Sequence, residues 1–289
     1  MRKRIPPWLI KKSFDISQLH GMKTLLRDKG LHTVCEEARC PNIGECFRKP
    51  TATFMIMGNT CTRKCRFCSV AKGNPKPLKQ DEPIRIAEAV KELGLKHVVI
   101  TSVTRDDLED GGASHFSKIV EEVRKINKNV VIEVLIPDFK GSQDSLSKVV
   151  FSKPDIINHN LETIARLYEE IRPGADYRRS LDLLKKAKEF HSGIITKSGL
   201  MVGLGEEPEE VIKTLKDLRG SECDMVTIGQ YLSPTKDSFP VEEYVQLETF
   251  EYYRKAGEEM GFKNIASAPF VRSSYMAEEQ SKLFAGKNL

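Results

Sequence analysis

No part of this sequence is apolar over the roughly 18 residues that a membrane-spanning helix needs, which argues against a membrane-embedded chain. A secretory signal is lacking too, because Pro6 and Pro7 interrupt the short apolar stretch at the basic N-terminus and no small-residue cleavage site follows it. There is no internal repeat, and 39% hydrophobic and 30% charged residues exclude collagen-like and disordered classes. We therefore expect a cytoplasmic globular protein.

The chain also has little excess charge of either sign. Its formal net charge is +5 over 289 residues, which does not by itself indicate nucleic-acid binding and suits an acidic protein partner equally well. We therefore expect neither a nucleic acid nor a membrane among its partners.

From Thr51 onward, short apolar runs alternate with longer amphipathic stretches. The runs predict six strands, at residues 53–57, 97–103, 130–136, 156–161, 194–202 and 225–232. The stretches between them predict helices, at residues 83–93, 115–126, 144–151, 181–190 and 209–218. This alternation predicts parallel βαβ units, and six strands favour a partial TIM-like (β/α)6 barrel over a closed eight-stranded one, with a doubly wound sheet as the rival. Both architectures place ligands at the carboxyl ends of the strands.

Two segments flank this α/β unit. Residues 1–50 show little periodicity beyond a short helix at 17–29, which predicts an extension wrapped on the rest of the molecule. A long helix is predicted at 241–261, before a C-terminal tail. The expected organisation is thus an extension that ends at residue 50, a barrel over 51–265 and a tail over 266–289.

Cysteine is scarce in most of the chain, because six of the seven residues lie within 35–68 and only Cys223 follows. Cys61, Cys65 and Cys68 have the spacing C-x3-C-x2-C directly after the first predicted strand. Three thiolates on one loop can hold three irons of a 4Fe-4S cluster and leave the fourth iron without a protein ligand. Zinc is the alternative, although a structural zinc site normally has four protein ligands. Cys223 is predicted to be a small core residue.

A second cysteine triplet precedes the first. Cys35, Cys40 and Cys46 have the spacing C-x4-C-x5-C within the extension, which predicts a second iron-sulfur cluster. The alternative is a zinc knuckle completed by His20 or His32, but this spacing fits no common zinc pattern.

The C-x3-C-x2-C triplet, with Phe67 just before its last cysteine, resembles the motif of radical S-adenosylmethionine (SAM) enzymes. The resemblance implies a partial barrel, an open iron that binds SAM, and a 5′-deoxyadenosyl radical that abstracts hydrogen from a saturated carbon. Both triplets, together with TSVTRDDLEDGGASHF, IRPGADYRRSL and the terminal PFVRSSY, are similar to the lipoyl synthase family over nearly the whole chain.

That resemblance implies a sulfurtransferase that inserts sulfur at C6 and C8 of an octanoyl chain on a lysine of a lipoyl carrier protein. It implies two 4Fe-4S clusters, with the one at the first triplet in the chain as sulfur donor, and two SAM molecules for each lipoyl group formed. The carrier would be a dehydrogenase E2 lipoyl domain or a glycine-cleavage H protein. A low-potential donor such as flavodoxin or ferredoxin would supply electrons.

The resemblance also implies site residues beyond the cysteines. A serine of Arg272-Ser273-Ser274-Tyr275, with Ser274 favoured over Ser273, would be the fourth ligand of the auxiliary cluster. The alternative is that Ser274 caps a helix that begins at Tyr275. SAM contacts are expected from residues at strand ends and in the loops after them, namely Thr101, Ser102, Glu133, Asn158, Arg172 and Lys197.

Several of these residues have structural alternatives. Ser102 would satisfy backbone donors, and Glu133 would pair with a neighbouring lysine. Four basic residues would bind the SAM carboxylate or the carrier surface, namely Arg172, Arg178, Arg179 and Lys197, although runs of basic residues are usually solvated helix faces. Arg172 and Lys197 are favoured because they lie in segments that match the family, near strand-to-helix loops.

Two other functions fit parts of the pattern. One is a radical SAM enzyme that thiolates another substrate such as tRNA, against which the short tail and the modest net charge speak. The other is a zinc-stabilised interaction module without catalysis.

Overall fold

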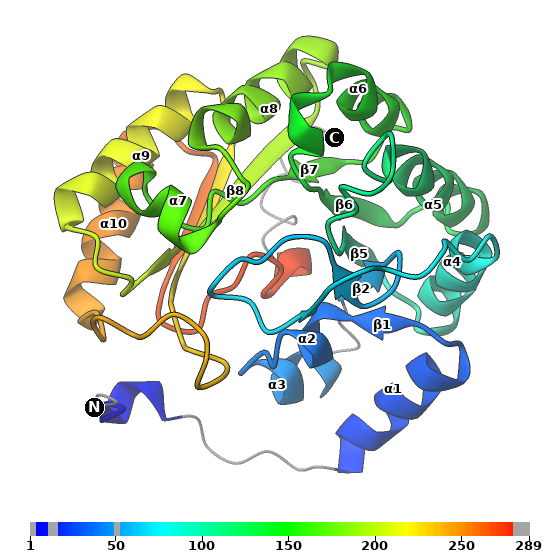
Figure 1. The fold of residues 1–289 in the computed structure, drawn as a ribbon, viewed down its shortest axis with the longest axis horizontal. Coiled ribbons are helices and arrows are strands. Elements are labelled where there is room, and N and C mark those ends of the chain that lie inside the picture. The colour runs from blue at the N-terminus through cyan, green and yellow to red at the C-terminus, as the bar shows by residue number, and fades with distance from the viewer. Residues whose placement is uncertain (1–3, 11–16, 49–52, 280–289) are drawn as a thin grey trace.

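The structure is a computed structural model that describes residues 4–10, 17–48 and 53–279. It shows a curved sheet with the order β1-β2-β5-β6-β7-β8-β9-β10, and its helices cover the outside of the curve (Figure 1). All six predicted strands form, as β2 Thr53–Ile56, β5 His97–Ser102, β6 Val131–Leu135, β7 Ile156–Asn158, β8 Ile195–Val202 and β9 Met225–Gln230. Each of these pairs in parallel with the next, and the sheet ends at β1 and β10 without closing, which confirms the partial barrel.

Two edge strands of the sheet were not predicted. Strand β1, His32–Thr33, pairs antiparallel with β2, and β10, Asn264–Ser267, pairs in parallel with β9. Both are very short, so neither has a run of apolar residues long enough to be recognised in the sequence. A further small sheet joins β3, Thr60–Cys61, to β4, Ala71–Lys72.

The outer helices carry apolar stripes that pack on the sheet. They are α4 Glu82–Glu92, α5 Ala113–Ile126, α6 Gln143–Phe151, α8 Tyr177–Phe190, α9 Pro208–Gly220 and α10 Leu247–Glu259. In α5, Phe116, Ile119, Val120 and Val123 are all buried, and this spacing of three and four residues places them on one helix face. The remaining helices are not part of the outer layer of the barrel. They are α1 Ser17–Asp28, α2 Val34–Glu37, α3 Ile43–Arg48 and α7 Tyr168–Ile171. Short 3-10 turns occur at Pro7–Leu9, Phe139–Gly141 and Ala165–Leu167.

Two predicted boundaries were wrong. The helix expected over 241–261 begins only at Leu247, the first residue of α10, because the residues before it are hydrogen-bonded to residues at the end of the sheet. The Val245 N–H donates to Gln230 Oε1 at 2.9 Å, and the Glu242 N–H donates to Gly203 O at 3.0 Å. The strand expected over 156–161 ends at Asn158, since the chain then turns inward to Glu162, whose φ is +67°.

The strands alternate between an apolar outer face and an inner face with many polar residues. In β2, Thr53 and Met55 line the central cavity, whereas Phe54 and Ile56 do not; Phe54, Met55 and Ile56 all take part in the hydrophobic core. Successive side chains of a strand point to opposite faces, so the period of two sends every second residue into the barrel. The inner positions are therefore where functional side chains are found.

The N-terminal extension and the C-terminal segment meet at the mouth of the barrel. The Asn42 Nδ2 donates to Phe270 O at 2.7 Å, and the Tyr275 hydroxyl donates to Glu45 Oε1 at 2.7 Å. Figure 1 shows this C-terminal segment inside the ring of strands, beside α2 and α3. Segments from opposite ends of the described chain thus form one wall of the central cavity.

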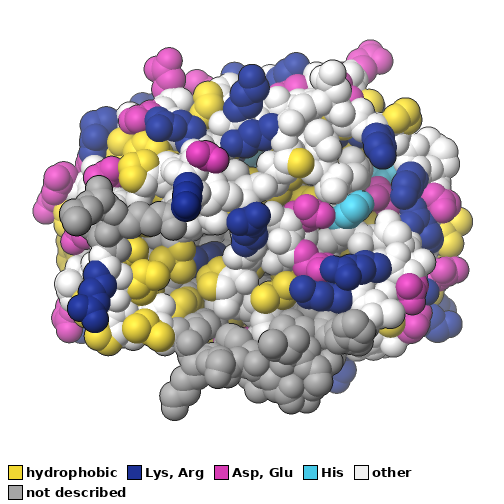
Figure 2. Space-filling model, turned by 60° about the horizontal axis from the view of Figure 1, so that its bottom comes forward, with side chains coloured by type: hydrophobic (Ala, Val, Ile, Leu, Met, Phe, Trp, Pro, Cys, Tyr) yellow, Lys and Arg dark blue, Asp and Glu magenta, His cyan; other side chains and the backbone are white. Residues whose placement is uncertain are grey.

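The surface shown in Figure 2 has a mixed character. Lys and Arg side chains are interspersed with Asp and Glu, and apolar side chains are exposed between them. Among the described residues, no helix has the length and apolarity that crossing a bilayer requires.

Asp224, directly before β9, forms ion pairs and a backbone hydrogen bond that join it to neighbouring segments. Its carboxylate accepts from the Thr196 N–H at 3.0 Å and forms ion pairs with Lys188 and, at 2.9 Å, with Lys263. Burial alone raises the pKa of this carboxyl, but the bonds from Lys188 and Thr196 outweigh it and lower the pKa. Asp155 makes similar contacts to Arg124 and to the Ile132 N–H, yet its side chain is 43% exposed against 8% for Asp224.

We expect Asp224→Asn to lower the free energy of unfolding by about 3 kcal/mol at pH 7, because the mutation leaves the largely buried ammonium group of Lys188 without its counter-charge. The matched change Asp155→Asn should cost less than about 1 kcal/mol, since its ion pair is solvated. Because the folded-state pKa of Asp224 is lowered, its contribution is present above the unfolded value of about 3.9 and is lost as the pH falls through the folded value. Urea titrations of both variants across pH 3–7 measure this. Equal losses for the two variants would contradict the assignment.

Candidate active site

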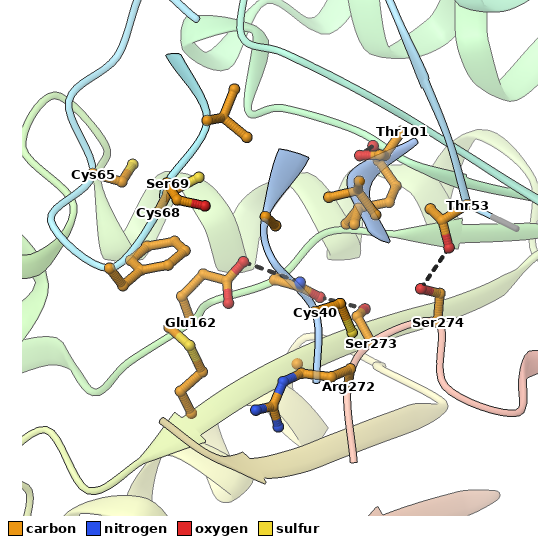
Figure 3. A pocket seen from close by; sticks show the side chains of 18 of the residues that line it. Cys40, Thr53, Cys65, Cys68, Ser69, Thr101, Glu162, Arg272, Ser273 and Ser274 are labelled. Carbon is orange, nitrogen blue, oxygen red and sulfur yellow. Dashed lines mark hydrogen bonds between the residues drawn. The ribbon is translucent and has the colours of Figure 1, made fainter. Parts of the chain in front are cut away.

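A single cavity of about 560 Å³ lies at the carboxyl ends of the strands. The cavity is lined by both predicted cysteine triplets, which are Cys35, Cys40, Cys46, Cys61, Cys65 and Cys68. The tail serines Ser273 and Ser274 lie in the same wall, and Figure 3 shows them across from Cys65 and Cys68. The fold therefore brings together three groups of predicted ligands that are far apart in sequence.

The later triplet sits on the loop after β2. The Cys61 sulfur accepts N–H bonds from Arg63 at 3.4 Å and Thr104 at 3.3 Å. Burial raises the pKa of the Cys65 thiol, and it raises that of Cys68 to about 11. These thiols are therefore protonated at neutral pH in the metal-free chain, and binding of a metal must release the protons.

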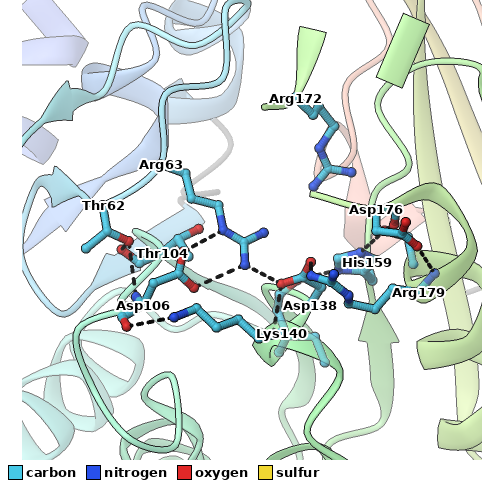
Figure 4. Close-up of polar contacts among 12 residues, drawn as sticks. Thr62, Arg63, Thr104, Asp106, Asp138, Lys140, His159, Arg172, Asp176 and Arg179 are labelled. Atoms are coloured by element: carbon cyan, nitrogen blue, oxygen red, sulfur yellow. Dashed lines mark hydrogen bonds and ion pairs between the residues drawn. The ribbon is translucent and has the colours of Figure 1, made fainter. Parts of the chain in front are cut away.

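Arg63 fixes this loop to the barrel. Its guanidinium, 6% exposed, donates to Asp106 Oδ2 at 2.8 Å and to Asp138 Oδ1 at 2.5 Å (Figure 4). Asp138 also accepts from Arg179 at 3.2 Å, so Arg179 is not the solvated residue that the sequence suggested. Although burial opposes it, pairing with Arg63 lowers the pKa of Asp138 to about 2. Arg63 lies between Cys61 and Cys65, so the cysteine loop is held by Asp106 and Asp138, in the segments that follow β5 and β6.

The earlier triplet is carried by two short helices. Cys35 lies in α2, Cys46 in α3, and Cys40 in the turn between them, where its N–H donates to Cys35 O at 3.1 Å. Burial raises the pKa of Cys35 to about 11. His32, one candidate to complete a zinc knuckle, has its Nδ1 3.3 Å from Glu37 Oε1, and the side chain of the other, His20, lies outside the described residues.

The tail serines have different environments. Ser273 Oγ accepts from Asn158 Nδ2 at 2.7 Å and donates to Asn160 Oδ1 at 2.9 Å. Ser274 Oγ accepts from the Thr53 hydroxyl at 2.7 Å. Residues 273–276 form a turn, and helical structure begins only at residue 277, so Ser274 does not cap a helix that begins at Tyr275.

Three of the six predicted SAM contacts line the cavity. Thr101 is the second-last residue of β5, and its hydroxyl donates to Leu135 O at 3.0 Å. Ser102 Oγ and Arg172 Nε are both buried with no partner within the described chain. Buried polar atoms normally have a hydrogen-bond partner, so these two indicate a polar ligand in the cavity.

The other three predicted contacts lie behind the cavity wall. Lys197 Nζ is 3.1 Å from Glu133 Oε1, both side chains are 0% exposed, and Asn158 Nδ2 donates to the same oxygen at 2.8 Å. Although burial alone raises the pKa of Glu133, Lys197 and His97 bring it down to about 2. Glu133, Asn158 and Lys197 are not among the residues that line the cavity, and their assignment as SAM contacts stays a prediction.

Sequence analysis missed Glu162, which follows the end of β7 and lines the cavity close to Cys65 and Cys68 (Figure 3). Its carboxylate accepts from Asn160 Nδ2 at 3.0 Å. Burial raises the pKa of Glu162 although the charge of Arg172 opposes the shift. Glu162 could have been predicted from its position directly after an apolar run, because side chains at the carboxyl ends of parallel barrel strands are exposed to the ligand.

Comparisons with known proteins agree with this geometry. A profile of the radical SAM superfamily matches residues 55–218. The lipoyl synthase of Caldanaerobacter subterraneus subsp. tengcongensis is 56% identical over 286 residues, which cover 99% of this chain and 100% of the relative. The lipoyl synthase of Alkaliphilus metalliredigens is 57% identical over 277 residues, which cover 96% of each chain.

Solved structures agree at the level of the fold. Methylornithine synthase superposes with a TM-score of 0.55 at 17% identity, covering 89% of this chain and 84% of the other. Coproporphyrinogen III oxidase from Escherichia coli, described as a radical SAM enzyme, gives a TM-score of 0.51 at 17% identity and covers 72% and 52%. Since the superfamily profile spans more than half of the chain and close relatives match nearly all of it, the chain belongs to the lipoyl synthase family within the radical SAM superfamily.

Proposed function

We propose that this enzyme inserts sulfur at C6 and C8 of an octanoyl chain carried on a lysine of a lipoyl carrier protein. The observation that carries the proposal is the convergence of both cysteine triplets and the tail serines on one cavity. Membership of the radical SAM superfamily implies a 4Fe-4S cluster and SAM. The barrel, residues 51–265, would hold these two, and the extension, 1–50, would act with the tail, 266–289, to hold a second cluster.

The thiols fit iron-sulfur clusters better than they fit zinc. Among the described residues, no three His, Cys, Asp or Glu side chains gather closely enough to hold a single metal ion. One ion needs all of its ligands around one point, whereas a four-iron cluster binds one thiolate at each of three separate irons. We therefore assign Cys61, Cys65 and Cys68 as ligands of the SAM-binding cluster.

Such a cluster, once reduced, supplies the electron that cleaves SAM to a radical able to remove hydrogen from a saturated carbon. The chain's own contribution is to bind and orient SAM. Among the described residues, Ser102 Oγ and Arg172 Nε have no hydrogen-bond partner, and both residues line the cavity, so we assign them to the polar groups of the SAM amino-acid portion. The carboxyl of Glu162 also lines the cavity, and we assign it to accept hydrogen bonds from hydroxyl groups of the ligand.

We assign Cys35, Cys40 and Cys46 to an auxiliary 4Fe-4S cluster that donates the sulfur, with Ser274 as its fourth ligand. A serine oxygen is a harder ligand than a thiolate, so its bond to a soft cluster is the easier one to give up. Ser274 is favoured over Ser273 because Ser273 both accepts from Asn158 and donates to Asn160.

The cavity also offers apolar side chains to the substrate chain. Met55, Leu135, Leu200 and Met201 line the cavity and suit the methylene groups of an octanoyl chain. The carrier would be an E2 lipoyl domain or a glycine-cleavage H protein, with flavodoxin or ferredoxin as electron donor. Mass spectrometry of an octanoylated carrier after anaerobic incubation with SAM and reductant tests the function directly, because each inserted sulfur adds a defined mass.

We expect Cys65→Ala to reduce SAM cleavage to background, because the SAM-binding cluster loses one of its three protein ligands. The yield of 5′-deoxyadenosine under reducing conditions measures this. Cys223→Ala is the matched control, since Cys223 is a buried cysteine outside both triplets. Wild-type yields from Cys65→Ala would overturn the assignment of this triplet.

Cys40→Ala separates the two triplets. It should still form 5′-deoxyadenosine within a few-fold of the wild-type rate, yet leave the carrier without added sulfur. The wild-type protein purified without oxygen should contain about eight iron and eight sulfide per chain, and the variant about half as much. A carrier that gains sulfur mass from Cys40→Ala, or zinc without sulfide in the wild type, would contradict the role of the auxiliary site.

A further inference from the structure

Thr53 lies between two of the segments that would hold the auxiliary cluster. It is the first residue of β2, it is 2% exposed, and it lines the cavity. Its hydroxyl donates to Ser274 Oγ at 2.7 Å, a contact visible in Figure 3. Helix α2, which carries Cys35, packs against β2. The first strand of the barrel therefore contacts both the helix that carries Cys35 and a serine of the tail.

The direction of the Thr53 hydroxyl is fixed by the sheet. Thr53 pairs with Val99 in the parallel ladder between β2 and β5, which sets its backbone. A β-branched side chain in a strand has few χ1 choices, and burial removes solvent as a competing partner. The hydroxyl of Thr53 is thus a preorganised donor rather than a mobile surface group.

The two serine hydroxyls differ in the number of hydrogen bonds that they make to the rest of the chain. Ser273 Oγ has both an acceptor and a donor partner, so its hydrogen-bonding capacity is largely used. For Ser274, Thr53 is the one hydrogen-bond partner in the described part of the chain, and that bond uses only one lone pair. The Ser274 oxygen keeps capacity to bind iron while Thr53 holds it.

We propose that Thr53 is a positioning residue that holds Ser274 Oγ toward Cys35, Cys40 and Cys46 and thereby completes the ligand set of the auxiliary cluster. The inference rests on the proposed function of that site. A hydrogen bond donated to a ligand oxygen orients it and withdraws charge from it, and loss of such outer contacts typically costs 10- to 100-fold in metal affinity or activity.

The test compares Thr53→Val, which keeps the branched shape but removes the hydroxyl, with Thr53→Ser, which keeps the hydroxyl. In anaerobically purified, 57Fe-labelled Thr53→Val we expect the Mössbauer component of the serine-bound iron to be shifted or lost. Sulfur insertion should fall about 10- to 100-fold while 5′-deoxyadenosine still forms. Thr53→Ser should restore the spectrum and most of the sulfur insertion.

A double variant shows whether Thr53 acts through Ser274. If it does, Thr53→Val combined with Ser274→Ala should insert sulfur no more slowly than Ser274→Ala alone. Multiplied losses in the double variant, an unchanged spectrum in Thr53→Val, or loss of its SAM cleavage would each overturn the positioning role. If Ser274→Ala itself leaves the spectrum unchanged, the assigned ligand is wrong, and the failure lies in the proposed function instead.

Discussion

The buried ion pair between Glu133 and Lys197 is the contact on which the arrangement of the site depends. Both side chains are fully buried inside the barrel, where an unpaired charge would cost several kcal/mol. Glu133 also binds Asn158, and Asn158 in turn donates to Ser273. The pair thus orients an amide that holds the C-terminal segment in the barrel. Asn158 thereby links this buried ion pair to the C-terminal segment.

The proposed auxiliary site draws on three parts of the chain that are distant in sequence. The extension supplies the cysteines, the tail supplies the serines, and the first barrel strand supplies Thr53. Contacts such as Asn42 to Phe270 and Tyr275 to Glu45 join the extension to the tail directly. None of these segments has a large core of its own, so the barrel provides the rigid frame on which they meet.

The cavity contains thiol and carboxyl groups whose charged forms are disfavoured by burial. Desolvation raises the pKa values of Cys35 and Cys68 to about 11, and it also raises that of Glu162. Arg172 counters the shift at Glu162, and iron would replace the protons on the thiols. A cavity that combines desolvated thiols with charged groups suits a reaction in which water must be kept from a reactive radical.

The sequence alone determined the features that depend on local patterns. Six strands and the helices between them followed from hydrophobic periodicity, and the cysteine spacing identified both triplets, because cysteines a few residues apart in sequence belong to the same short segment of the chain. Tertiary structure decided what depends on partners far along the chain. It paired Glu133 with Lys197, held residues 241–246 out of the helix through bonds to Gly203 and Gln230, and set Glu162 in the cavity. It also placed Thr53 beside Ser274, 221 residues away, a contact that no local pattern encodes because the curvature of the sheet creates it.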